Sequence, residues 1–193
     1  NPLAEARDDI ELEQIAEILV RSGNPNSGGK DDFWLQGAIR FVSLFAKCLK
    51  NAEQETPGVF NLHNLNYLFQ NFGEDGSALD DFMSRYTVNP DDPDDESLWN
   101  EWKGVLTGNK EGVQSFVLNA ITALKSLSNN NLARLTAQSD IQLEDIRKEK
   151  TIIYLITPPQ HAEYYSFLTS LFFRSVFNAC MRKLPDRKTL PVY

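Results

Sequence analysis

A helical period of apolar residues, repeated through the first 128 residues, constrains the fold of this chain more than any other feature. In DDIELEQIAEILVRSG (8–23), Leu12, Ile15 and Leu19 fall on one helical face and acids fill the first turn. Comparable patterns occur in DDFWLQGAIRFVSLFAKCLKN (31–51), NLHNLNYLFQNFG (61–73), SALDDFMSRY (77–86), DESLWNEWKGVLTG (95–108) and NKEGVQSFVLNAITALKSLS (109–128). Because amphipathic helices gain most of their stability by burying one face, the sequence predicts a helical bundle.

The second of these segments is expected at the centre of the bundle. Its apolar residues run from Phe33 and Trp34 to Leu49 and form a stripe too broad for a single neighbouring helix. The third segment is predicted to start after an N-cap at Asn61 and to stop at Gly73.

The composition is that of a globular domain. Hydrophobic residues make up 41% of the 193 residues, which is too apolar for intrinsic disorder. No apolar run reaches the roughly 18 residues that span a bilayer. Cys48 and Cys180 lie far apart in apolar helical patterns, so we expect buried thiols in a reducing compartment and a cytoplasmic location.

The pattern changes after Asn129. The segment NNNLARLTAQSD (129–140) is polar and weakly patterned, and 139–142 (SDIQ) has the form of a capping box. TIIYLITP (151–158) is predicted to be a strand buried on both faces, residues 160–184 a long helix, and LPVY (190–193) the start of a second strand.

These C-terminal elements predict a right-handed βαβ unit. The expected fold is therefore mainly α, a helical bundle with a small C-terminal βαβ remnant of an α/β sheet. Two strands make a poor sheet, and the chain starts with Asn and stops in an apolar run. We therefore expect a fragment of a longer protein whose other strands complete the sheet.

The negative charge is concentrated in one region. Residues 74–101 carry ten acids and one base, whereas the whole chain has a net charge of −8. The sequence DDPDDE lacks the alternating acids, the central Gly and the final Glu of a calcium loop. Two interpretations remain open: a solvated acidic loop, or a patch that repels nucleic acid and docks a basic protein partner. The candidate partner-binding residues are Asp91, Asp92, Asp94, Asp95 and Glu96.

The sequence predicts no catalytic, cofactor or metal site within the chain. GNPNSGGKDD (23–32) resembles a P-loop, but its Gly-Lys pair comes one residue late and two acids replace the magnesium-binding hydroxyl. We expect a linker with Asp31 or Asp32 as N-cap. His63 and His161 are isolated from other metal ligands, and Trp99 and Trp102 are expected to pack in the core.

Several segments, taken in order, resemble one protein family. They are the opening NPL, DDFW at the start of the second helix, SDIQLEDIRKEKTIIYLITP, and the long helix before LPVY. They look like the type IV secretion coupling proteins, the TraG/TraD-type ATPases of bacterial conjugation and effector export. The resemblance covers nearly the whole chain, although each motif is short.

The resemblance implies a division of the chain. In that family an all-helical domain interrupts a RecA-like nucleotide-binding domain. Residues 1–138 would be the helical domain and residues 139–193 the return into the nucleotide-binding domain. The Walker A loop would precede Asn1 and the second acidic ATPase motif would follow Tyr193. The fragment is then expected to be no enzyme, while ATP and magnesium belong to the full-length ATPase.

The resemblance also implies partners. The helical domain would recruit relaxase, accessory or effector proteins to the secretion channel, in a parent that forms a hexameric ring anchored at the inner membrane by a segment absent here. The fragment itself is expected to be monomeric and without membrane contact. The alternative is a part of the motor that contacts single-stranded DNA, because residues 147–193 carry eight bases and three acids.

Overall fold

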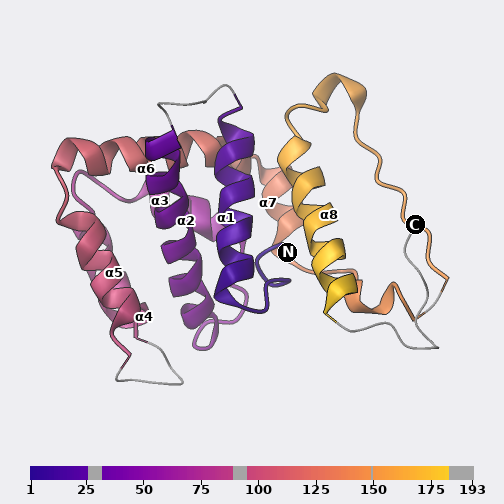
Figure 1. Ribbon diagram of the computed structural model, residues 1–193, viewed down its shortest axis with the longest axis horizontal. Helices are drawn as coiled ribbons and strands as arrows, with labels where there is room; N and C mark the ends of the chain where they lie inside the picture. The colour runs from indigo at the N-terminus through magenta and orange to yellow at the C-terminus, as the bar shows by residue number, and fades with distance from the viewer. Residues whose placement is uncertain (26–31, 89–94, 149, 183–193) are drawn as a thin grey trace.

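A computed structural model describes residues 1–25, 32–88, 95–148 and 150–182. Eight α-helices lie within these residues (Figure 1). They are α1 (Asp9–Gly23), α2 (Asp32–Glu53), α3 (Leu62–Gln70), α4 (Asp80–Tyr86), α5 (Ser97–Leu106), α6 (Lys110–Leu124), α7 (Asn130–Ala137) and α8 (Ser166–Met181). Short 3₁₀ turns are η2 (Ser77–Leu79), η3 (Lys125–Ser128), η4 (Leu143–Asp145) and η5 (Pro159–His161).

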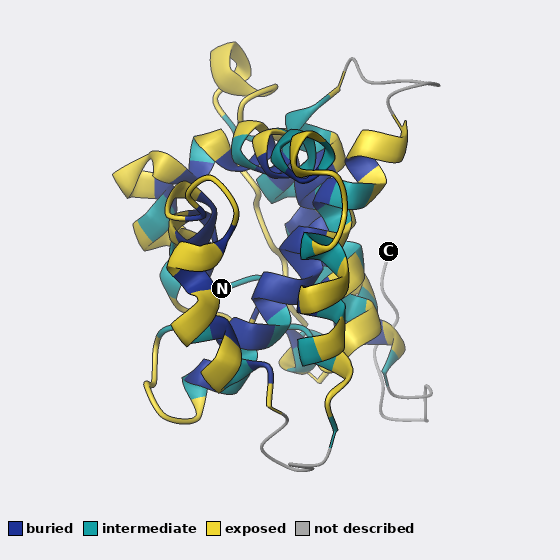
Figure 2. Ribbon diagram, turned by 90° about the vertical axis from the view of Figure 1, so that its left-hand side faces the viewer, coloured by how far each residue is buried: buried dark blue, intermediate teal, exposed yellow. Residues whose placement is uncertain are grey.

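Helix α2 is the centre of the bundle, as its broad apolar stripe predicts. It contacts α1, α3, α4, α5 and α6, and buried residues gather on the surfaces that these helices turn toward one another (Figure 2). Phe45 of α2 lies 4.7 Å from the ring of Phe69 and 6.0 Å from that of Trp102, measured between ring centroids. Burying large aromatic side chains in this way supplies much of the stability of a small domain.

Polar side chains act as N-caps at the starts of several helices. Asp8 accepts a hydrogen bond from the Glu11 amide at the start of α1, and Asn61 accepts one from Asn64 at the start of α3. The predicted N-cap at Asn61 is therefore confirmed. Such caps satisfy amides that have no partner inside the helix.

Two expectations at helix starts are corrected. Phe33 is 64% exposed although its ring lies 5.5 Å from that of Phe116 in α6, so the first turn of α2 lies at the edge of the core rather than inside it. Asp32 is the first residue of α2 rather than its cap, and Asp31 lies outside the described residues.

Helix α7 is an element that the sequence pattern did not predict. The polar run 130–138 forms it because Asn129 caps the Asn131 amide and because Leu132 fills the core. The capping box at 139–142 starts no α-helix, and only η4 follows it. The Ser139 hydroxyl instead donates to the Glu5 carboxylate, at 2.9 Å.

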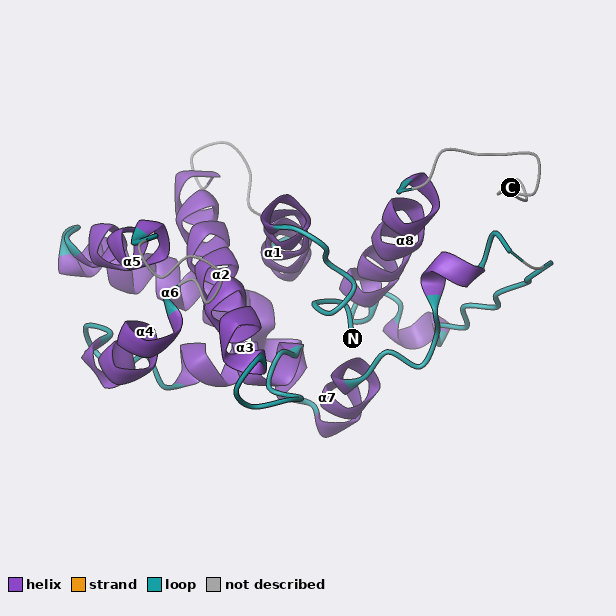
Figure 3. Cartoon of the chain, turned by 90° about the horizontal axis from the view of Figure 1, so that it is seen from below, coloured by secondary structure: helices purple, strands orange, loops and turns teal. Residues whose placement is uncertain are grey.

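The predicted βαβ unit is not found in the described part of the chain. Residues 151–158 are an extended loop, and Figure 3 shows only helices and loops. A strand needs a neighbouring strand for its backbone hydrogen bonds, and no described segment lies in register with this one. The described residues therefore do not support the prediction of a strand buried on both faces at 151–158. The segment 190–193 lies outside the described residues.

The C-terminal residues lie to one side of the bundle. Helix α8 packs beside α1, on the side of α1 away from α2, and the extended segment 151–158 lies beyond α8 (Figures 1 and 3). The α-helix predicted over 160–184 is shorter, since α8 begins at Ser166 after η5 and a turn. Residues 139–182 are called the C-terminal unit below.

Candidate functional site

Two of the five predicted docking residues lie within the described chain, directly before α5. Asp95 accepts a hydrogen bond from the Ser97 amide, at 2.9 Å, so its carboxylate supports the start of the helix. Glu96 is exposed and makes no side-chain cap. Asp91, Asp92 and Asp94 lie outside the described residues.

Other acids between residues 74 and 101 have structural partners. Glu74 pairs with Lys110 at 3.4 Å, and Glu101 pairs with Arg40 at 3.0 Å. The pKa of Asp75 lies below its ordinary value because the Ser77 hydroxyl, and then the Ser77 amide, donate hydrogen bonds to its carboxylate. Part of the acidity in this region therefore holds turns and helices in place.

Three described carboxylates remain available to a partner. Asp80 and Asp81 are exposed in the first turn of α4, and Glu96 is exposed before α5, the helix that α4 contacts. None of the three has an ion pair with another described residue.

The second notable surface is the extended segment. Ile152, Tyr154 and Ile156 are 78%, 81% and 88% exposed, whereas Ile153 and Leu155 between them are 38% and 46% exposed. This alternation is that of an extended strand with one side turned toward the protein. The backbone of residues 152–157 makes no hydrogen bond to any other described residue. The segment therefore offers both apolar side chains and unpaired peptide groups.

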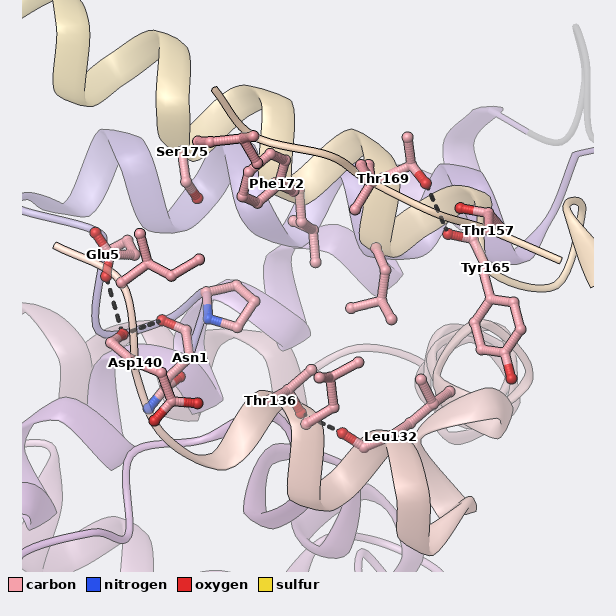
Figure 4. A pocket seen from close by; sticks show the side chains of 18 of the residues that line it. Asn1, Glu5, Leu132, Thr136, Asp140, Thr157, Tyr165, Thr169, Phe172 and Ser175 are labelled. Atoms are coloured by element: carbon pink, nitrogen blue, oxygen red, sulfur yellow. Dashed lines mark hydrogen bonds between the residues drawn. The ribbon is translucent and has the colours of Figure 1, made fainter. Parts of the chain in front are cut away.

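An apolar cavity of about 530 Å³ lies between this segment, α7 and α8. Leu132 and Thr136 of α7, Thr157 of the segment, and Phe172 and Ser175 of α8 line it (Figure 4). Most of its wall is aliphatic or aromatic, so the inner side of the extended segment is incompletely packed against the helices.

The comparison with protein families decides the assignment. The family model described as type IV secretory system conjugative DNA transfer matches residues 1–193. The chain belongs to this family. Comparisons with curated proteins and with solved structures found no match.

Membership of the conjugative DNA transfer family agrees with the resemblance found in the sequence. The mainly helical fold expected from that resemblance is present in the described residues. None of the described helices is long and apolar enough to cross a membrane.

The histidines and cysteines of this conjugative DNA transfer chain lie apart from one another in the described residues. His63 and His161 are exposed, and no group of three or more potential metal ligands occurs there. Cys48 is free and buried, and burial raises the pKa of its thiol to about 12. A thiol of that kind is unreactive at neutral pH.

The two tryptophans are packing residues, as predicted. Trp102 is fully buried next to Phe45 and Phe72, and the Lys103 ammonium lies 4.4 Å above the centroid of the Trp99 ring. The sequence did not reveal the ion pairs that hold the C-terminal unit to Arg7 and to Glu11 of α1, because the partners are more than a hundred residues apart.

Proposed function

We propose that the helical bundle of this conjugative DNA transfer chain receives the protein substrates of transfer. The docking surface would be the acidic region 74–101, and the substrate surface would be basic. Membership of the family indicates that the chain takes part in conjugative DNA transfer. The negative charge of the region indicates that its partner is basic. Ten acids and one base leave this region at −9, against −8 for the whole chain.

The observation that carries the proposal is the set of available carboxylates at the starts of α4 and α5. Asp80 and Asp81 are exposed in the first turn of α4, and Glu96 is exposed directly before α5, the helix that α4 contacts. Their field extends over a Debye length, about 8 Å at physiological salt. Such a field accelerates the approach of a cationic surface and disfavours nucleic acid.

Titration calorimetry with a basic relaxase or effector protein tests this proposal. Replacing Asp80, Asp81 and Glu96 with Lys should weaken binding at least tenfold and flatten its salt dependence. The control reverses three exposed acids of the C-terminal unit, Asp140, Asp145 and Glu163, and should leave binding within a factor of about two. Equal affinities for the two triple variants would rule the surface out.

We further propose that residues 152–157 join the sheet of a RecA-like nucleotide-binding domain in the complete transfer motor. Unpaired peptide groups along an apolar segment are what a neighbouring strand would satisfy. Both sides of the segment are apolar, as in a central strand of a parallel sheet. The helical bundle would thereby be attached to the part that turns over nucleotide.

The chain itself is proposed to lack nucleotide turnover. In the P-loop-like stretch 23–32, the Gly-Lys pair comes one residue later than in a P-loop. Acidic residues also occupy the position of the hydroxyl that would bind magnesium. A steady-state assay of ATP hydrolysis should therefore give the rate of the buffer blank. ATP and magnesium would act in the complete protein.

The alternative role, contact with single-stranded DNA, has less support. Arg147 donates to the Cys180 carbonyl, Lys148 pairs with Asp145, and Arg182 pairs with Glu11. Because these cations already have partners within the protein, they are poorly available to bind the phosphates of DNA. Filter binding at low salt should show weak retention of single-stranded DNA or none, and strong retention would favour this alternative.

A further inference from the structure

Helix α8 contacts the bundle in two different ways along its length. In its N-terminal half, Phe167 and Leu171 are buried in the main core cluster. In its C-terminal half, Ala179 and Cys180 are also buried, together with Leu143 of η4, but these three lie outside that cluster. The two halves of α8 thus belong to different packing units.

Polar groups connect the C-terminal half of α8 to the bundle. The Arg182 guanidinium donates to the Glu11 carboxylate of α1 at 2.7 Å and to the Glu5 carbonyl. It also lies 3.6 Å from Glu144, which pairs with Arg7. We call this set of four charged side chains, Arg7, Glu11, Glu144 and Arg182, the ionic latch.

The interface between α1 and α8 is also loosely packed away from the latch, between residues 14–22 of α1 and residues 170–174 of α8. A cavity of about 310 Å³ lies there, lined mainly by polar residues that include Gln14, Glu17, Ser170 and Arg174. Arg174 bridges to Gln14 at 3.0 Å at its edge. Interfaces that are polar and incompletely packed permit relative movement of the two parts.

The closed latch also leaves a polar group unsatisfied. The Arg182 Nε atom is buried and has no hydrogen-bond partner among the described residues, although the same guanidinium donates to two acceptors and lies 3.6 Å from Glu144. Exposure of this donor to water offsets part of the interaction lost when the ion pairs break. Opening is therefore less unfavourable than it is for a fully satisfied pair.

We infer that the ionic latch is a conformational device that releases the C-terminal half of α8 from α1. The helix pivots at Phe167 and Leu171, which stay in the core, and η4 moves with its C-terminal end. The extended segment 151–158 belongs to the same unit, so opening changes its position relative to the helical bundle. The inference goes beyond the proposed docking function, because it concerns how the two parts of the chain move.

Distance measurements between two spin labels test this inference in the full chain. Tyr67 of α3 and Phe177 of α8 are 58% and 59% exposed, so each can be replaced with a labelled cysteine. Cys180 is changed to Ser, and Cys48 remains because it is buried. At low salt, the labels should report one dominant distance, that of the closed latch.

The decisive variant is Glu11→Gln, and Glu13→Gln is its matched control. Glu13 lies on the same helix but pairs with Lys47 of α2, at 3.2 Å. Removing the charge at Glu11 should raise the population with a second, longer distance on the order of tenfold, the effect of losing one charged hydrogen bond. Glu13→Gln should leave the distribution unchanged.

Salt provides a second measurement that needs no substitution in the latch. Raising the ionic strength to about 1 M shortens the Debye length to about 3 Å and should increase the longer-distance population in the otherwise unaltered chain. A single distance in Glu11→Gln and at high salt would overturn the inference. Loss of helical signal together with the change in distance would also overturn it, because the latch would then support the whole fold.

Discussion

Individual glycines determine how closely the helices approach. A Cβ at Gly23 would lie 2.3 Å from the Ala123 Cα, whereas one at Gly104 would meet nothing within 4 Å. Gly23→Ala should therefore destabilise the protein by about 1–3 kcal/mol, because backbone atoms of α1 and α6 must separate. Gly104→Ala should stabilise it by about 0.5–1 kcal/mol through helix propensity. Urea unfolding of the two variants tests this, and equal midpoints would contradict the predicted packing.

The buried thiol of Cys48 gives a second prediction for a single residue. Its pKa of about 12, against an ordinary value of 9.0, lowers the thiolate population about a thousandfold near pH 8. In a Cys180→Ser variant, an aromatic disulfide reagent should leave Cys48 unmodified for hours and titrate it at once in urea. Rapid modification without denaturant would show that α2 is not the centre of the core.

At the scale of elements, α8 should be anchored by one face only. Leu171 is 1% exposed, so Leu171→Ala should cost about 2–5 kcal/mol of unfolding free energy. Phe173 is 60% exposed on the same helix, and Phe173→Ala should change stability by less than about 0.5 kcal/mol. Thermal unfolding followed by circular dichroism compares the two variants. A larger loss of stability for Phe173→Ala than for Leu171→Ala would contradict the described orientation of α8, because Phe173 would then lie on the buried face.

Periodicity and capping residues were sufficient to predict most of the bundle. The apolar stripe of α2 and the cap at Asn61 depend on residues close in sequence, which is why they could be recognised. Helix α7 was not predicted because its segment is mostly polar and is held to the core mainly by one apolar residue, Leu132. The predicted strand at 151–158 failed for a different reason: its residues favour a strand, but pairing depends on a partner that local sequence does not supply.

The candidate site was only partly predictable for the same reason. Local composition marked the acidic region, but it did not show that Asp95 supports a helix start or that Glu101 pairs with Arg40. Those contacts arise from turn geometry and from the approach of two helices. Only the three-dimensional structure therefore distinguishes the carboxylates that hold the fold from those that are available to a partner, such as Asp80 and Asp81.

For the molecule as a whole, the described chain consists of a helical bundle, whose core also includes Phe167 and Leu171 of α8, and of a C-terminal unit that contains an unpaired apolar segment. This division underlies the proposal that the bundle receives substrates while residues 152–157 join the sheet of a motor domain.

Hydrogen exchange of the whole chain, resolved by peptide, tests this division most directly. Amides of residues 152–157 have no partner among the described residues, so they should exchange at nearly the rate of an unfolded peptide. Amides in the buried middle of α2 should exchange only through global unfolding. Strong protection of 152–157, comparable to that of α2, would mean that the segment is already a paired strand and would contradict the account.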